Sequence, residues 1–214
     1  MESLKNLLTE ISITAQKYQR PLDKIKLVAV SKKQPVEKIL QALQFGHFDF
    51  GENYVQEALE KMEIVNNPNV RWHLIGPLQK NKVNKIIGKF FLIHSIDTFD
   101  LAKEISQKSE KQKIVQPVLL QVNLASEISK SGFSKQDLLN KWKELQSLDG
   151  IFIQGLMTMP PLDNSEIYFE ELFNLAKTLH LKELSMGTTS DWPLALKHGA
   201  TYIRIGTAVF GERE

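Results

Sequence analysis

The sequence contains no cysteine, which excludes a disulfide framework, a thiol nucleophile and a thiolate metal site. It has no apolar run approaching the roughly 20 residues that a membrane-spanning helix needs. Charged residues interrupt the N-terminal stretch, so we expect no signal peptide, no membrane contact and a cytoplasmic location. The formal net charge of the 214 residues is only +2, which is too small to indicate a nucleic-acid partner.

Three further absences bear on the fold and the chemistry. No segment rich in glycine, proline or serine divides the chain, so we predict a single domain over residues 1–214. The turn after the first predicted strand, Ser31-Lys32-Lys33-Gln34-Pro35, lacks the glycines of a dinucleotide-binding turn. This argues against a doubly wound open sheet, the alternative α/β fold. His47, His94, His180 and His198 show none of the spacings typical of metal ligands, and we predict no metal site.

The sequence does have a regular alternation of short apolar runs and amphipathic segments. Apolar residues recur at helical spacing from Leu4 to Tyr18 and predict an opening helix. The predicted strands are 26–31, 47–50, 71–75, 90–94, 117–123, 151–157, 183–186 and 202–205. The helices predicted between them are 35–45, 53–65, 79–87, 97–109, 135–148, 165–179 and 191–198. Strands rich in valine, isoleucine and leucine indicate parallel pairing, so we predict an α/β fold, a (β/α)₈ TIM barrel with an additional N-terminal helix.

Polar residues and glycines follow the carboxyl ends of these strands, where barrels of this kind carry their functional sites. Any one of these residues could be a helix cap or a turn residue. Their common placement at one rim instead predicts a binding site. The candidates are Lys32, Asn53, Ser185, Thr189, Arg204, Gly206 and Thr207.

The residue types at this rim suit an aldehyde that carries a phosphate group. A lysine at the end of a buried strand is unfavourable unless it is paired or chemically used, and the Lys32 amine could condense with an aldehyde to form an imine. Gly206 and Thr207 would present backbone N–H groups to a phosphate, and the Ser185 and Thr189 hydroxyls could add donors. An amine and a phosphate cradle together are what a pyridoxal phosphate site needs.

Arg204 lies two residues before Gly206, so its side chain should point into the barrel from the same strand end. There it could face the ring nitrogen of the cofactor and keep that nitrogen unprotonated, which would make the ring a poor electron sink.

Two plainer interpretations stay open. Lys32 could be a barrel-mouth lysine paired with an acid, and His73 is more easily read as a core residue or one that orients a neighbour than as a catalyst. We predict no catalytic residue.

Several segments resemble one family, and they occur in its order from about Lys26 to Gly211. The segments are 28–32 (VAVSK), 50–57 (FGENYVQE), 72–82 (WHLIGPLQKNK), 122–123 with 130–133 (VN, KSGF), 155–159 (GLMTM), 184–187 (LSMG) with Asp191, and 204–211 (RIGTAVFG). Together they resemble the pyridoxal phosphate homeostasis proteins, single-domain relatives of the alanine racemase N-terminal barrel, a fold-type III pyridoxal phosphate (PLP) fold.

The resemblance implies roles for particular residues. Lys32 corresponds to the lysine that forms the internal aldimine with PLP, and Arg204 to the arginine near the pyridine nitrogen. Asn53 corresponds to a residue that lines the ring. Ser185, Gly206 and Thr207 correspond to residues on the phosphate side.

One departure from the family pattern follows the seventh strand. The family usually reads Met-Gly-Met-Ser there, whereas this sequence reads Met186-Gly187-Thr188-Thr189. Thr189 keeps a hydroxyl, so we expect contact with the phosphate to survive. Thr188 removes a large apolar side chain, which changes the packing beside the cofactor.

The resemblance also implies a function, because members of the family are similar in lacking robust turnover and in holding the cofactor. We therefore expect a monomeric PLP carrier that takes part in intracellular PLP homeostasis and could deliver PLP to apo-enzymes. Two alternatives stay open: a PLP-dependent amino-acid racemase of weak activity, and a phosphate-binding barrel without aldehyde chemistry. Related racemases carry a second, β-rich domain with a second proton-transfer residue. Because the sequence ends at Glu214, soon after Gly211, we favour the carrier.

Overall fold

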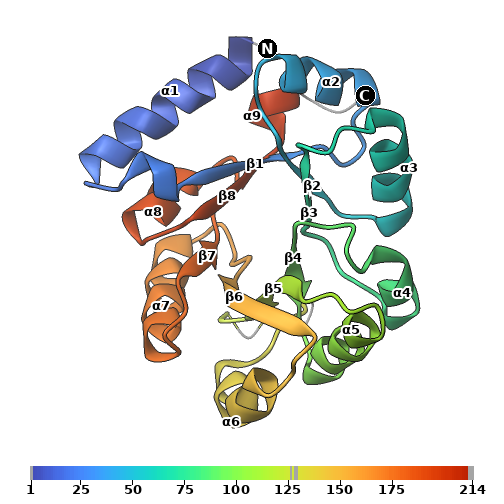
Figure 1. Ribbon diagram of the computed structural model, residues 1–214. Helices are drawn as coiled ribbons and strands as arrows, with labels where there is room; N and C mark the ends of the chain where they lie inside the picture. Colours follow the sequence, from blue (N-terminus) through green and yellow to red (C-terminus); the bar gives the residue numbers. More distant parts are fainter. Residues whose placement is uncertain (1, 126, 128–129, 212–214) are drawn as a thin grey trace.

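The computed structural model describes residues 2–125, 127 and 130–211, and within them eight strands close into a parallel barrel (Figure 1). Neighbours in sequence are neighbours in the sheet, and pairing of the last strand with the first completes the barrel. The strands are β1 (Lys26–Val30), β2 (Asp49–Glu52), β3 (Arg71–Leu74), β4 (Leu92–Ile96), β5 (Gln116–Gln121), β6 (Ile151–Met157), β7 (Glu183–Ser185) and β8 (Tyr202–Ile205). The predicted (β/α)₈ barrel is confirmed.

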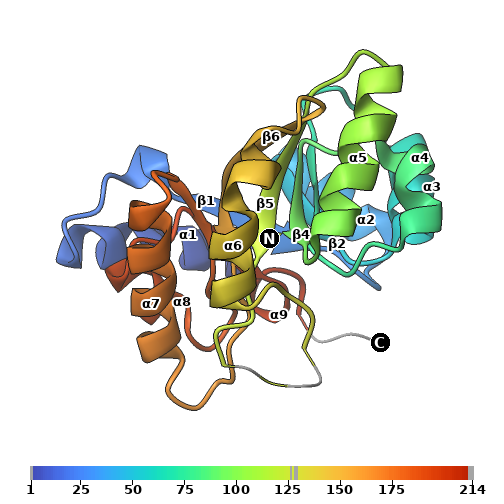
Figure 2. The ribbon, with the colours of Figure 1, turned by 90° about the horizontal axis from the view of Figure 1, so that it is seen from below.

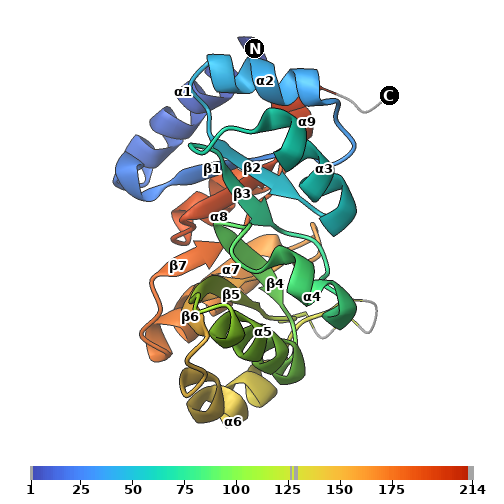
Figure 3. The ribbon, with the colours of Figure 1, turned by 45° about the vertical axis from the view of Figure 1, so that its right-hand side comes forward.

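Helices surround the strands, as two further views show (Figures 2 and 3). They are α1 (Glu2–Lys17), α2 (Val36–Gln44), α3 (Val55–Val65), α4 (Val83–Ile86), α5 (Phe99–Lys111), α6 (Lys135–Gln146), α7 (Ser165–Thr178), α8 (Trp192–Lys197) and α9 (Thr207–Phe210), with short 3₁₀ turns η1 (Leu22–Lys24) and η2 (Lys80–Lys82). The additional N-terminal helix α1 lies against α8 and α9, where the Ser3 hydroxyl donates to the Val209 carbonyl at 3.1 Å. In the described part of the chain, no helix is long and apolar enough to cross a bilayer.

The ends of several elements differ from those predicted. The second strand was predicted at 47–50 but begins at Asp49, because pairing with β3 sets Asp49 opposite Arg71 and Phe50 opposite Trp72. Gly51 and Glu52 are therefore strand residues rather than loop residues. The single helix predicted at 79–87 is a 3₁₀ turn followed by the one-turn helix α4.

The strands carry two separate apolar clusters, one on each face. Leu27 and Ala29 of β1 belong to the large cluster between strands and helices, whereas the intervening Val28 belongs to a small second cluster. Successive side chains of a strand point to opposite faces, so the second cluster lies inside the barrel. Its members are Val28, Leu92, Leu119, Met157 and Tyr202. The same inward face also carries the charged and polar side chains described below.

Candidate functional site

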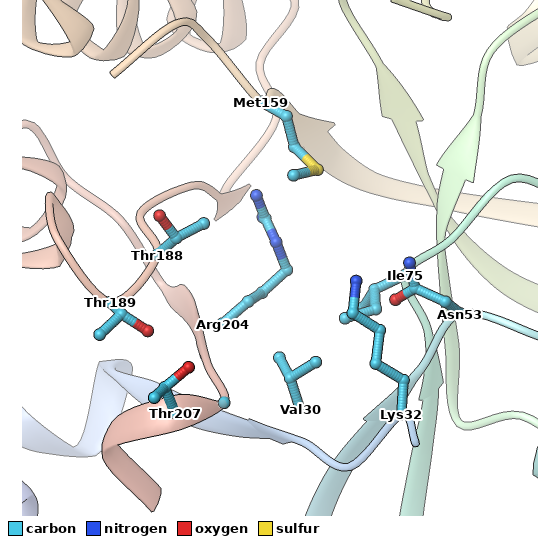
Figure 4. A pocket seen from close by; sticks show the side chains of 10 residues that line it. Val30, Lys32, Asn53, Ile75, Met159, Thr188, Thr189, Arg204 and Thr207 are labelled. Atoms are coloured by element: carbon cyan, nitrogen blue, oxygen red, sulfur yellow. The ribbon is translucent and has the colours of Figure 1, made fainter. Parts of the chain in front are cut away.

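A cavity of about 160 Å³ opens at the carboxyl ends of the strands. Its lining comes from β1, β8 and the loops after β1, β2, β3, β6, β7 and β8 (Figure 4). The lining residues are Val30, Lys32, Asn53, Ile75, Met159, Thr188, Thr189, Arg204, Gly206 and Thr207. The structure thus brings together all the predicted site residues except Ser185. A second cavity of about 190 Å³ adjoins the first and shares Asn53, Ile75 and Met159 with it.

The polar groups of the cavity are sorted by position (Figure 4). Lys32 and Asn53 lie together on one side, and Thr189 and Thr207 lie together on the other. The Arg204 side chain projects between these two sides. A ligand in this cavity therefore meets an amine and an amide at one side, hydroxyls at the other, and a guanidinium group between them.

The turn that carries Lys32 is held by α3 on both sides of that residue. The Lys61 amine donates to the Ser31 carbonyl at 2.6 Å, and the Glu57 carboxylate accepts from the Lys33 backbone N–H at 2.5 Å. Lys33 has a φ of 57°, in the left-handed region, so this turn is a tight one. Because both flanking residues are bound, the direction in which Lys32 leaves the backbone is fixed.

Sequence reasoning missed Glu57 and Lys61. The available signal was the position of Lys61 on the buried face of α3, with Ala58 and Val65, where an apolar residue is expected. A lysine in such a place needs a buried partner. Lys61 has one in Glu52, at 2.8 Å.

The buried carboxylate of Glu52 completes the support of this turn. The Glu52 Oε1 atom accepts from the Ser31 hydroxyl at 2.6 Å as well as from Lys61. Burial raises the pKa of Glu52, although the hydrogen bonds from Lys61 and Ser31 oppose that change. Glu52 therefore supports the Lys32 turn from below and is not among the residues lining the cavity.

Asn53 is placed by a close approach between two loops. A Cβ atom on Gly76 would lie 2.5 Å from the Asn53 carbonyl oxygen and 2.7 Å from its Cβ, so only glycine fits at position 76. The Asn53 Oδ1 atom is buried and has no hydrogen-bond partner among the described residues. Buried polar atoms are normally hydrogen-bonded, so a donor on a ligand would satisfy this one.

Arg204 is buried, and hydrogen bonds hold both ends of its guanidinium group. Its Nη2 atom donates to the Thr158 carbonyl at 2.9 Å, and its Nη1 atom donates to the Ser185 hydroxyl at 2.5 Å. Burial lowers the pKa of Arg204 to about 10, while Asp191 raises it. The guanidinium is therefore charged at neutral pH, and its orientation in the cavity wall is fixed.

The structure does not bring Ser185 to the cavity. Its side chain is fully buried, and its oxygen lies between the Arg204 Nη1 atom and, at 2.7 Å, the His94 Nδ1 atom. The sequence predicts this hydroxyl on the phosphate side. It sits behind Arg204 because β7 ends at Ser185, one layer below Thr188 and Thr189.

Thr188, at the departure from the family pattern, lines the cavity beside Thr189. Its backbone N–H and its hydroxyl both donate to Asp191 Oδ1, at 2.6 Å and 3.0 Å. The Thr188 hydroxyl thus fixes the loop that leads into α8. Thr189 is the residue that offers a hydroxyl to the cavity in Figure 4.

Ionisable groups are few at this site. Among the described residues that line the cavity, only Lys32 and Arg204 have ionisable side chains. Tyr54, the residue after Asn53, is half exposed and does not line the cavity. No set of three or more histidine, aspartate or glutamate side chains within residues 2–125, 127 and 130–211 could hold a metal ion.

Comparisons with known proteins find relatives that match the whole chain. The alanine racemase N-terminal domain family matches residues 3–214. A pyridoxal phosphate homeostasis protein of Aquifex aeolicus is 39% identical over 223 residues, which cover 100% of this chain and 98% of that protein. The chain belongs to the pyridoxal phosphate homeostasis protein family. The resemblance seen in the sequence motifs is therefore confirmed.

Two further relatives of this family extend the comparison. The pyridoxal phosphate homeostasis protein of Pasteurella multocida is 36% identical over 226 residues, covering 100% of this chain and 97% of that protein. The solved structure of PipY from Synechococcus elongatus, with PLP bound, superimposes with a TM-score of 0.84 at 36% identity. The superposition covers 95% of this chain and 100% of the PipY chain, so the two proteins share the whole barrel.

Proposed function

We propose that this protein binds PLP covalently through Lys32 and acts as a PLP carrier and buffer in the cytoplasm. The observation that carries the proposal is one cavity in which the Lys32 amine faces the hydroxyls of Thr189 and Thr207 across Arg204. Imine formation joins the Lys32 nitrogen to the aldehyde carbon and releases the aldehyde oxygen as water. PipY, a close relative in sequence and fold, has PLP bound.

The residues of the cavity fit the separate parts of PLP. Gly206 and Thr207, at the turn after β8, and Thr189 offer donors to a phosphate dianion. The unpartnered Asn53 Oδ1 atom offers an acceptor to a ligand donor. Arg204 can only donate, so a ring nitrogen that faces it accepts a hydrogen bond and stays unprotonated.

The same geometry favours a carrier over a racemase. A racemase needs proton-transfer groups on both faces of its substrate, whereas among the described residues that line the cavity only Lys32 and Arg204 have ionisable side chains. An unprotonated ring is also a poor electron sink for carbanion chemistry. Membership in the alanine racemase N-terminal domain family is the observation that keeps the racemase as a second candidate.

A matched pair of lysine variants tests the covalent site. Purified protein mixed with PLP should show an imine absorption band that borohydride abolishes. Lys32→Arg keeps the positive charge but cannot form the imine, so the band should be lost. Lys33→Arg removes the neighbouring, exposed amine, so the band should persist. A band that survives in Lys32→Arg and disappears in Lys33→Arg would overturn the assignment.

Delivery and turnover need separate assays. PLP-loaded protein should activate a PLP-dependent apo-enzyme in the presence of a phosphatase that destroys free PLP, whereas free PLP should not.

Racemase assays with several amino acids should show no steady turnover that depends on Lys32. Turnover abolished by Lys32→Arg would make the protein an enzyme instead. We further propose that the carrier is a monomer, which light scattering on the purified protein would test.

A further inference from the structure

A line of hydrogen-bonded side chains crosses the barrel interior below the cavity, from Arg204 on β8 to Asp49 on β2. Arg204 Nη1 contacts Ser185 Oγ at 2.5 Å, and Ser185 Oγ contacts His94 Nδ1 at 2.7 Å. His94 Nε2 lies 3.0 Å from His73 Nδ1, and His73 Nε2 lies 3.1 Å from Asp49 Oδ1. We call these five residues the Arg204–Asp49 row. Its members come from five different strands, so the row ties opposite parts of the barrel together.

The row is shielded from water along its length. Ser185, His94 and His73 are 0% exposed, and the Tyr202 ring packs against both imidazoles at centroid distances of 5.3 and 5.7 Å. A buried network in which every group has a partner is stiff and polarises its own members. A broken link would leave a buried polar group without a partner.

The far end of the row is anchored by an ionised carboxylate. Arg71 donates to both Asp49 oxygens, from Nε at 2.7 Å and from Nη2 at 2.5 Å. Burial raises the pKa of Asp49, but the hydrogen bonds from Arg71 and His73 outweigh it and hold the pKa well below its usual value. A carboxylate only accepts hydrogen bonds, so His73 Nε2 must carry a proton.

This anchor fixes the position of every proton in the row. Burial lowers the pKa of His73, although Asp49 opposes this, and burial together with the positive charge of Arg204 lowers the pKa of His94 well below its usual value. Each imidazole is then neutral and carries one proton. Since His73 Nε2 holds its proton, His73 Nδ1 accepts and His94 Nε2 donates.

The remaining links follow from the same rule. His94 Nδ1 has no proton, so it accepts from the Ser185 hydroxyl. The Ser185 oxygen in turn accepts from Arg204. All donors therefore point one way, from Arg204 through Ser185, His94 and His73 to Asp49, and no contact in the row is left with two donors or two acceptors facing each other.

We propose that Ser185, His94, His73 and Asp49 are positioning residues that orient Arg204 toward the cofactor ring and polarise its guanidinium group. A serine oxygen whose own proton is donated onward is a stronger acceptor, so it holds Arg204 more firmly from beneath. Thr158 holds the second guanidinium nitrogen, and together the two contacts fix the plane of the group. The role toward the ring rests on the proposed function, whereas the direction of the row does not.

The direction of the row can be measured on the protein without PLP. Nitrogen-15 NMR of histidine-labelled protein distinguishes the two neutral tautomers from the imidazolium. We expect both His73 and His94 to carry a single proton on Nε2. Asp49→Asn replaces the carboxylate with an amide that can donate, so it should turn the tautomers to Nδ1–H or mix them. A protonated imidazole, or an Nδ1–H tautomer in the unsubstituted protein, would overturn the proposal.

The role toward the cofactor is tested by two variants of similar size at position 94. The amide oxygen of His94→Asn falls near the position of Nδ1 and can accept from Ser185, whereas His94→Leu cannot. With PLP bound, we expect His94→Leu to shift the imine absorption band and to weaken PLP retention by roughly tenfold. His94→Asn should restore both toward the original values. Equal behaviour of the two variants, changed or unchanged, would contradict the proposal.

The two experiments separate this inference from the proposed function. If the unsubstituted protein forms no imine with PLP, the proposed function fails and the role toward the ring fails with it. The tautomers still decide whether the directed row exists. If the imine forms at Lys32 but the tautomers or the variants at position 94 disagree, only the present inference is overturned. Should His94→Leu fail to fold, Asp49→Asn provides the spectral comparison, with a shifted band expected and an unshifted band contradicting the role.

Discussion

The outward and inward faces of the barrel strands carry different kinds of residue. On β8, Ile203 and Ile205 point outward into the apolar layer beneath the helices, whereas Arg204 between them points inward to the cavity wall. On β4, Ile93 belongs to the outer layer and His94 to the Arg204–Asp49 row. A period of two thus separates residues that hold the fold together from residues that prepare the site.

The comparison also shows why the inward face tolerates charge. Each buried polar group of the Arg204–Asp49 row has a partner on another strand, so none of the row is left with an unsatisfied hydrogen bond. The outward face needs no such network, because apolar contact with the helices suffices. One charged pair, Glu52 with Lys61, departs from this rule on the outward side.

The largest effect is expected at that exception. Lys61→Met should destabilise the protein by about 3–5 kcal/mol, because it leaves the buried Glu52 carboxylate without its cation. Denaturant unfolding measures this. Lys103→Met, an exposed lysine on α5, is the control and should stay within about 0.5 kcal/mol. Equal stability of the two variants would show that the pair is not needed.

Substitution in the outer apolar layer should lower stability while leaving the site intact. Leu74 on β3 is fully buried beneath the helices, so Leu74→Ala should reduce the free energy of unfolding by about 2–5 kcal/mol. The imine absorption band with PLP should be unchanged, because the neighbouring inward residue His73 is not altered. A shifted band would contradict the separation of the two faces.

Loss of one rim hydroxyl should lower the affinity for PLP while leaving the stability of the protein unchanged. Thr207→Val keeps the shape of the side chain, which is exposed, so stability should change by less than about 0.5 kcal/mol. A hydrogen bond to a charged phosphate is worth about 1.5–3 kcal/mol, so PLP affinity should fall roughly 10- to 100-fold. Equilibrium titration with PLP measures this, and Thr207→Ser should retain most of the affinity. Unchanged affinity in the valine variant would remove Thr207 from the phosphate site.

The smallest effect is a dependence of stability on pH. Burial lowers the pKa values of His73 and His94, so below the unfolded value of about 6.5 the unfolded chain binds more protons than the folded one. The stability that depends on these two neutral histidines should therefore be fully present above about pH 6.5. The free energy of unfolding should fall as the pH drops below that value. The slope is at most about 1.4 kcal/mol per pH unit for each histidine.

Histidine variants isolate this contribution. The free energy of unfolding, measured between pH 5 and 7, should change less steeply with pH in His94→Asn than in the unsubstituted protein. His180→Asn replaces an exposed histidine in a left-handed turn that asparagine tolerates, so it should leave the slope unchanged. A slope that responds to position 180 and not to position 94 would contradict the assignment of neutral, buried imidazoles.

Much of the fold could be predicted from sequence because its signals are local. The apolar runs and amphipathic segments predict the strands and helices, and β6 and β8 begin and end where expected. Parallel strands also bring their carboxyl ends to one rim, so Lys32 and Arg204 could be placed at one site although they lie far apart in the sequence.

What could not be predicted depends on contacts across the barrel. Ser185 was expected beside the phosphate, but strand length and register place it behind Arg204. His73 was read as a residue that packs or orients a neighbour, and only the closed barrel reveals its partners, Asp49 and His94. The support of the Lys32 turn by Lys61 likewise depends on how α3 docks, which no single segment encodes.

The most direct test of the central claim is peptide mass mapping after borohydride reduction of the protein with PLP. We predict one phosphopyridoxyl group per chain, assigned by fragmentation to Lys32 and not to Lys33. A label on another lysine, or no label at all, would contradict the account.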